Sequence, residues 1–351
     1  MLSPQKIILP VKYPMITTYT QHAHLLSILS NHEETYPWIM SNYIQLYTNK
    51  DYKYNWSDFY FPLPYELRPS DTCKWIHTQK IHKDRISSEW GSIIDFIIDS
   101  INNNNYLNIM VDCYFISQYN DYKKHHQIHE SFIFGYDYTQ KIFFSSDFFN
   151  KNGYQYKEIP FSEYQKAFMS YTELNTYDFL NGMVYTFEFN PGYRYVFCFD
   201  NIVNAIHAYL AGAPPEYWEM YNQYNLYWDM NNCPNKNNIV FGREIYNSLN
   251  NYLESVKNSD ASEIIILPFY LLYDHKRLMS LRIDFLNKSG FLKKKNSKNE
   301  IFSQIENEVN IIMNLIIKYS FVKKKAIIEK IQNKLNEINK IEFDALNDIF
   351  G

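Results

Sequence analysis

The sequence predicts an α+β fold, in which an antiparallel sheet is followed by a mainly helical C-terminal part. Two observations carry this prediction. Three strand-like apolar runs follow one another at residues 107–116, 129–137 and 141–149, and beyond residue 200 the apolar residues recur at helical spacing. We therefore expect a first region over residues 1–165, and a mainly helical region over residues 166–351 that completes its pocket.

The second and third runs form a predicted hairpin. They are joined by the short polar turn Tyr138-Thr139-Gln140, and strand-like segments separated by so few residues pair antiparallel. The first run, LNIMVDCYFI, is largely apolar, which is typical of a strand buried on both faces. A further strand is expected over residues 183–189, which read MVYTFEF.

Helices are expected around these strands and throughout the C-terminal part. In the first half of the chain, helical spacing covers residues 24–29, 38–47, 89–98 and 162–174. The segment after Asp200 should end at Gly212, ahead of two prolines. Pro268 should kink or start a later helix. The charged, isoleucine-rich tail over residues 299–350 predicts two long helices.

Composition indicates a globular, cytoplasmic protein. Hydrophobic residues make up 46% of the 351 residues, enough for a packed core, and a net charge of −4 gives no basic field that would recruit nucleic acid. Glycine is scarce, with 9 residues, and no glycine-rich phosphate-binding motif occurs. No apolar run is long enough to span a membrane and no signal peptide is recognisable, so the four cysteines are expected to be reduced.

A cysteine, a histidine and an acid fall at the ends of the three predicted strands. Cys113 ends the first run, His129 begins the second and Asp147 ends the third. The hairpin turn brings the start of the second strand beside the end of the third, so His129 and Asp147 should lie together. A cysteine nucleophile needs a base and a group that orients this base. We therefore assign Cys113 as nucleophile, His129 as base and Asp147 as orienting acid.

The polar segment between Cys113 and His129 would form a loop over this site. Its basic residues Lys123, Lys124, His125 and His126 would add positive potential that lowers the pKa of the thiol. A metal site is the competing use of His125, His126 and His129. We expect no metal, because the segment precedes a strand and no cysteine or second carboxylate falls at ligand spacing.

The nine residues from His129 to Asp137 read HESFIFGYD and lead into a strand that ends at Asp147. This stretch resembles papain-like cysteine peptidases of the bacteriocin-processing type, in which the catalytic histidine opens a strand that runs into a Gly-Tyr-Asp turn. The chain is more similar to BtrH-like acyltransferases. They share the VDCYFI strand, the Tyr- and His-rich loop, an N-terminal helix like AHLLSIL, and a helical half echoed in FGREIYNSLNNYL and LLYDHKRLMSLRIDFL. The resemblance covers roughly residues 15–290, and extends to the amide-forming cysteine-protease homologues of closthioamide biosynthesis.

The resemblance implies a papain-like core and an acyltransferase of antibiotic biosynthesis. Such an enzyme takes an acyl group from the pantetheine thioester of an acyl or peptidyl carrier protein, holds it on cysteine and passes it to a small amine, such as a diamine. No cofactor is bound, and the pantetheine arm serves as the substrate handle. The usual cysteine of the family precedes the N-terminal helix, where this chain reads TYTQH over residues 18–22. Either the nucleophile is lost or it has moved to Cys113, and we favour the move. Gln21 is the candidate oxyanion donor by analogy with the papain-like glutamine.

Three functions stay open at this point. The first is the acyltransferase, with a carrier protein and an amine as partners. The second is a peptidase or amidase that uses the same triad. The third is a catalytically inactive module that binds a metabolite or a carrier protein, with Cys113 as an ordinary core thiol. We expect neither nucleic acid nor membrane as a partner, and a homodimer is left open. The lysine clusters 293–295 and 323–325 are candidate docking patches for an acidic carrier.

Overall fold

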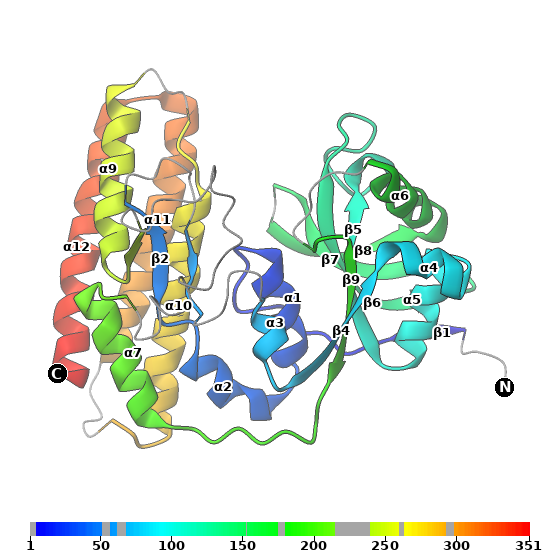
Figure 1. Ribbon diagram of the computed structural model, residues 1–351. Helices are drawn as coiled ribbons and strands as arrows, with labels where there is room; N and C mark the ends of the chain where they lie inside the picture. The colour runs from blue at the N-terminus through cyan, green and yellow to red at the C-terminus, as the bar shows by residue number, and fades with distance from the viewer. Residues whose placement is uncertain are drawn as a thin grey trace. The chain divides into compact units, whose positions relative to one another are not determined.

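The computed structural model describes residues 5–50, 57–61, 68–151, 153–174, 180–214, 239–259, 263–292 and 298–351. The chain forms two compact units (Figure 1). The first unit combines residues 1–35 with 68–194, and the second combines residues 36–67 with 195–351. This division differs from the expected boundary at residue 165. The helix and strand that follow residue 160 stay with the first unit, and an early segment joins the second.

An antiparallel sheet forms the centre of the first unit. Its strands are β1 (Lys6–Ile8), β4 (Ile76–His82), β5 (Asn105–Asp112), β6 (Ile128–Asp137), β7 (Ile142–Asn150), β8 (Gly153–Pro160) and β9 (Met183–Phe189). They run in the order β4-β9-β5-β6-β7-β8, and β1 pairs with β6. The predicted hairpin is confirmed, because β6 and β7 pair antiparallel with Asp137 opposite Ile142.

The strand predicted over residues 107–116 ends earlier than expected. β5 stops at Asp112, and a short 3₁₀ helix, η2 (Cys113–Phe115), follows it. The side chain of Asp112 accepts a hydrogen bond from the backbone N–H of Tyr114 at 3.1 Å, which caps η2. Cys113 is therefore the first residue of this turn and not a strand residue.

Helices cover both faces of this sheet. They are α1 (Thr20–Leu29), α3 (Pro69–Thr72), α4 (Lys83–Trp90), α5 (Ile93–Asn102) and α6 (Phe161–Leu174). Figure 1 shows α1 and α3 on one side of the sheet, and α4, α5 and α6 on the other. The single helix expected over residues 89–98 is two helices. Gly91 ends α4 with a φ of 78°, and Ser92 caps α5 by accepting a hydrogen bond from the N–H of Asp95.

The second unit is mainly helical, as expected. Its elements are α2 (Tyr36–Ser41), β2 (Leu46–Asn49), β3 (Ser57–Phe59), α7 (Phe199–Ala211), β10 (Ile239–Phe241), α9 (Glu244–Asn258), α10 (Leu267–Lys288), α11 (Lys298–Val322) and α12 (Lys325–Phe350). The two long tail helices are confirmed, and Pro268 starts α10. The helix expected over residues 38–47 ends at Ser41, because the residues beyond it pair as β2 in a small sheet with β3 and β10.

A buried ion pair holds the long helices of the second unit in register. Nζ of Lys276 on α10 lies 2.8 Å from both carboxylate oxygens of Glu342 on α12, and both side chains are fully buried. Tyr209 of α7 and Tyr246 of α9 each donate a hydrogen bond of 2.9 Å to the same carboxylate. Four helices therefore meet at one charge, and a shift of any helix would leave a buried polar group unpaired.

Candidate functional site

His129 and Asp147 form a hydrogen-bonded ion pair between β6 and β7. Nδ1 of His129 lies 2.7 Å from Oδ2 of Asp147, as the hairpin predicts. Asp147 is fully buried, whereas 30% of the His129 side chain is exposed. The hydroxyl of Tyr119 donates to the same Oδ2 at 2.5 Å, and the backbone N–H of Phe148 donates to Oδ1 at 2.7 Å. Three donors thus satisfy the buried carboxylate and fix its orientation.

The carboxylate sets both the tautomer and the charge of His129. Because Nδ1–H donates to Asp147, Nε2 is the nitrogen left for acid–base chemistry. Burial by itself lowers the pKa of His129, but the carboxylate of Asp147 raises it more, and the pKa rises to about 9. At pH 7 the ring is therefore mostly imidazolium, and roughly one molecule in a hundred carries the neutral base.

Cys113 follows β5 at the edge of the same site. In the pairing of β5 with β6, Val111 lies opposite His129. The N–H of Cys113 continues this ladder by donating to the carbonyl of Gln127 at 2.8 Å. The thiol is deeply buried, with 2% of the residue exposed. The structure therefore joins Cys113 to the strand of His129 by backbone pairing, but does not present its sulfur to solvent.

The surroundings of Cys113 oppose formation of a thiolate. Burial raises the pKa of the thiol, and the carboxylates of Asp147, Asp121 and Asp112 raise it further. The expectation that the basic residues 123–126 lower this pKa is therefore wrong. Those side chains are exposed to water, which screens their charge, whereas Asp147 and Asp112 are buried carboxylates. The resting form of Cys113 is the neutral thiol.

The His129–Asp147 pair and the N-terminal helix α1 lie on different faces of the sheet. On β7, Asp147 shares a face with Phe143, whose ring centroid lies 4.3 Å from that of Phe161 in α6. The ion pair therefore lies on the face that α6 covers. On the other face, His24 of α1 stacks on Phe132 with ring centroids 5.1 Å apart. The site and the N-terminal helix are thus on opposite sides of the sheet.

A buried ionic network occupies the face that α1 covers. Arg68 donates two hydrogen bonds, of 2.5 and 2.6 Å, to the carboxylate of Glu130. Asn108 donates to the same group at 2.7 Å and Thr20 at 3.0 Å. Burial by itself raises the pKa of Glu130, but the guanidinium of Arg68 outweighs it and lowers the pKa to about 2. The network fixes the first turn of α1 and the start of α3 on β6, next to His129.

Gln21, the candidate oxyanion donor, follows Thr20 in the first turn of α1. Its amide nitrogen lies 3.5 Å from Nε2 of His22. Because α1 covers the face opposite the ion pair, this position lends no support to an oxyanion role for Gln21. The helix that would carry the usual nucleophile of the papain-like resemblance thus lies across the sheet from His129 and Asp147.

A second histidine–carboxylate pair lies next to Cys113. Nδ1 of His126 is 2.6 Å from Oδ2 of the fully buried Asp112, which also accepts a hydrogen bond of 2.8 Å from Ser170. His126 and His129 thus bind different carboxylates and do not converge as metal ligands. Within the described ranges, no group of three or more His, Cys, Asp or Glu side chains is placed to hold a metal ion.

Three features of this region were not predicted from the sequence. They are the bond from Tyr119 to Asp147, the His126–Asp112 pair and the Arg68–Glu130 network. For Glu130, a signal was present: a charged residue inside a predicted strand needs a partner if the sheet buries it. No comparable pattern marks Tyr119, because tyrosine is abundant throughout the chain, with 33 residues.

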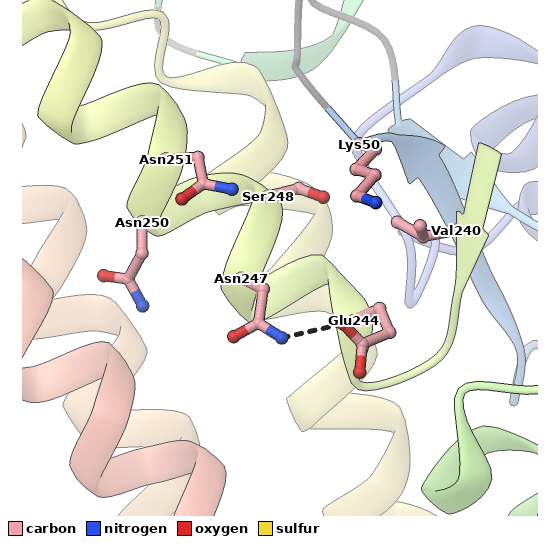
Figure 2. Close-up of a pocket in the computed structure, with 7 residues that line it drawn as sticks. All are labelled: Lys50, Val240, Glu244, Asn247, Ser248, Asn250 and Asn251. Atoms are coloured by element: carbon pink, nitrogen blue, oxygen red, sulfur yellow. Dashed lines mark hydrogen bonds between the residues drawn. The ribbon is translucent and has the colours of Figure 1, made fainter. Parts of the chain in front are cut away.

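A cavity of about 340 Å³ lies in the second unit (Figure 2). It is lined by Lys50, Val240, Glu244, Asn247, Ser248, Asn250 and Asn251. Five of these residues lie on successive turns of α9, and Asn247 donates a hydrogen bond of 2.7 Å to Glu244. None of the seven side chains is a thiol or an imidazole. The lining of this cavity therefore offers no cysteine nucleophile and no histidine base.

Comparison with known proteins adds no family to this description. No protein-family model matches the chain, and a search of curated proteins finds no match either. Among the helices described here, none is long and apolar enough to cross a membrane.

Acid should weaken the fold through Glu130. Its pKa is lower in the folded protein, about 2, than its ordinary value of 4.5, so the ion pair with Arg68 stabilises the fold above pH 4.5 and loses this effect as the pH falls toward 2. We expect Glu130→Gln to lower the free energy of unfolding by about 3–5 kcal/mol at pH 7, because it leaves Arg68 buried and uncompensated. Urea unfolding at pH 7 and pH 2.5 should show this difference shrinking in acid.

Glu188→Gln is the matched control, because Glu188 is an exposed carboxylate on β9 of the same sheet. It should change the free energy of unfolding little at either pH. An equal effect of Glu130→Gln at both pH values would contradict the assigned pKa shift.

Proposed function

We propose that the chain is a cysteine-dependent acyltransferase with a papain-like core. It would move an acyl group from the pantetheine thioester of a carrier protein to an amine, with the reaction at His129, Asp147 and Cys113. The observation that carries this proposal is the fully buried Asp147, which holds a partly exposed imidazole through Nδ1. The resemblance of residues 129–147 to BtrH-like acyltransferases supports the choice of substrate class.

In the first half-reaction, neutral His129 takes the proton of Cys113 as the sulfur attacks the thioester carbonyl. The bond between the carbonyl carbon and the pantetheine sulfur then breaks, and the imidazolium returns the proton to the leaving sulfur. Asp147 stabilises the imidazolium that forms in between. Because Cys113 rests as a thiol, His129 has to remove its proton while the sulfur attacks. A stable thiolate does not form beforehand.

In the second half-reaction, the amine attacks the acyl–Cys113 thioester. His129 takes a proton from the amine nitrogen and delivers it to the leaving sulfur of Cys113, which restores the thiol and releases the amide. Exclusion of water favours aminolysis over hydrolysis. The apolar rings around this site, including Phe149 at 4.8 Å from Tyr119 by ring centroid, are suited to that exclusion.

A second route to the same product is favoured by the burial of Cys113. With 2% of the residue exposed and the pKa of its thiol raised, the acyl group could instead pass directly from the carrier thioester to the amine. His129 would then act on the amine alone. The two routes differ in whether a covalent acyl-enzyme forms, so a mass measurement separates them.

Incubation with an acyl-loaded carrier protein, without amine, should add one acyl mass to the wild-type chain. Cys113→Ala should abolish this adduct and the formation of amide, while His129→Ala should slow both by about 10²–10⁴-fold because the base is lost. Intact-mass spectrometry and peptide mapping locate the adduct. Cys73→Ala serves as a control, because Cys73 is another buried free thiol of the same unit.

Each other outcome points to a different function. Amide formation by Cys113→Ala at the wild-type rate would replace the covalent route with direct transfer. Cleavage of the thioester or of a peptide without consumption of amine would favour the peptidase or amidase. Binding of the loaded carrier without any turnover would leave the inactive binding module.

The rate of the first half-reaction should rise with pH up to about 9. Only neutral His129 acts as base, and its pKa is about 9, so kcat/KM for release of pantetheine thiol should increase about tenfold per pH unit below that value and then level off. Asp147→Asn removes the carboxylate that raises the pKa, so the inflection should move toward 6.5 and the plateau should fall. Stopped-flow detection of the released thiol measures this profile. A wild-type profile that is flat between pH 7 and 9 would contradict the proposed role of His129.

A further inference from the structure

Four consecutive basic side chains form an exposed turn beside the proposed site. We define the basic turn as Lys123, Lys124, His125 and His126, all of which are exposed. The chain as a whole carries a net charge of −4, whereas the basic turn carries the positive charges of its lysines. The acids next to the turn are Asp121 and Asp112, and Asp112 is fully buried against His126, so the charges exposed to an approaching ligand are mainly those of the two lysines. The turn therefore presents a positive field to an approaching ligand.

The basic turn is held rigidly next to the site. The N–H of Lys123 donates to the carbonyl of Tyr114 in η2 at 3.0 Å, and the N–H of Asn120 donates to the carbonyl of Phe149 in β7 at 2.9 Å. Tyr119, one residue earlier, donates its hydroxyl to Asp147. The loop that carries the basic turn thus contacts both the residue after Cys113 and the strand that carries Asp147.

One imidazole of the basic turn is fixed in a defined orientation although it lies at the surface. His126 is bound through Nδ1 to the buried Asp112 at 2.6 Å, and its ring stacks on Tyr114 with centroids 4.2 Å apart. Its side chain is nevertheless 51% exposed. An exposed histidine seldom needs a buried carboxylate and a stacked ring to hold it, whereas a ligand-binding histidine benefits from both.

We infer that the basic turn binds the phosphate of the 4′-phosphopantetheine arm, an inference that rests on the proposed function. A carrier-borne arm has one phosphate at one end and the thioester at the other, so an enzyme that acts on the thioester meets the phosphate at the rim of its site. Lys123 and Lys124 supply charged donors of the kind that bind phosphate oxygens, and the imidazole of His126 lies beside them in the same turn. The turn is tied to both η2 and β7, so it lies at such a rim. This assignment differs from the expected docking patches, of which residues 293–295 lie outside the described residues and residues 323–325 lie in the second unit.

The test compares ligands that differ only in the phosphate. Isothermal titration calorimetry would measure binding of pantetheine, 4′-phosphopantetheine and inorganic phosphate to the full chain. We expect wild type to bind 4′-phosphopantetheine about tenfold or more tightly than pantetheine, since a hydrogen bond to a charged group contributes at least that factor. In the variant Lys123→Gln/Lys124→Gln/His126→Gln this ratio should fall to about 1. Lys12→Gln, an exposed lysine next to α1 on the other face, should keep it.

The outcomes separate this inference from the proposed function. No preference for 4′-phosphopantetheine in wild type, or a preference that survives in the folded triple variant, would overturn it. Inorganic phosphate binding as tightly as 4′-phosphopantetheine would overturn the assignment to the pantetheine arm. If binding depends on the phosphate but no acyl transfer occurs, the proposed acyltransferase function is wrong and the phosphate site is supported. If the chain transfers acyl groups from pantetheine and 4′-phosphopantetheine thioesters with equal KM, the acyltransferase function is supported and the phosphate site is wrong. Circular dichroism checks that the triple variant is folded.

Discussion

Asp147 is a carboxylate without exposure to water, and the arrangement of the site follows from how that charge is satisfied. Its two oxygens accept hydrogen bonds from His129, Tyr119 and the backbone of Phe148. A buried carboxylate that lost one of these donors would incur a large desolvation cost. The requirement to pair this charge therefore orients the imidazole, holds the loop that contains Tyr119 against β7, and raises the pKa of His129.

The same charge has opposite consequences for the base and for the proposed nucleophile. It raises the pKa of His129 and so favours imidazolium, and it adds to the burial that raises the pKa of Cys113 and so disfavours thiolate. A ready-made thiolate–imidazolium pair is thus unfavourable at this site. The proposed chemistry consequently needs concerted proton transfer at Cys113, or direct attack by the amine, and it should be faster in mildly alkaline solution.

Sequence patterns predicted the part of the site that is built from segments close together in the sequence. The turn at residues 138–140 sufficed to bring His129 and Asp147 together, because a hairpin register follows from the turn that closes it. The end of β5 at Asp112 was missed, since the capping bond to Tyr114 leaves no mark in the apolar pattern. The electrostatics of Cys113 were also predicted with the wrong sign. The basic residues are visible in the sequence, but whether a charge is buried or exposed depends on tertiary packing. The boundary expected at residue 165 differs from the observed division for a similar reason, because β2 pairs with β10 from much later in the chain.

The pKa of His129 tests the central claim most directly, because it reports the charge of Asp147 and the contact between the two side chains in one number. It can be measured by NMR titration of the histidine Cε1–H resonances, with His129→Gln identifying the signal among the 10 histidines. The account predicts a midpoint near pH 9 in wild type and a much lower midpoint in Asp147→Asn, where burial still lowers the pKa and the carboxylate that raised it is gone. A wild-type midpoint near 6.5 that does not move in Asp147→Asn would contradict the buried ion pair and the site built on it.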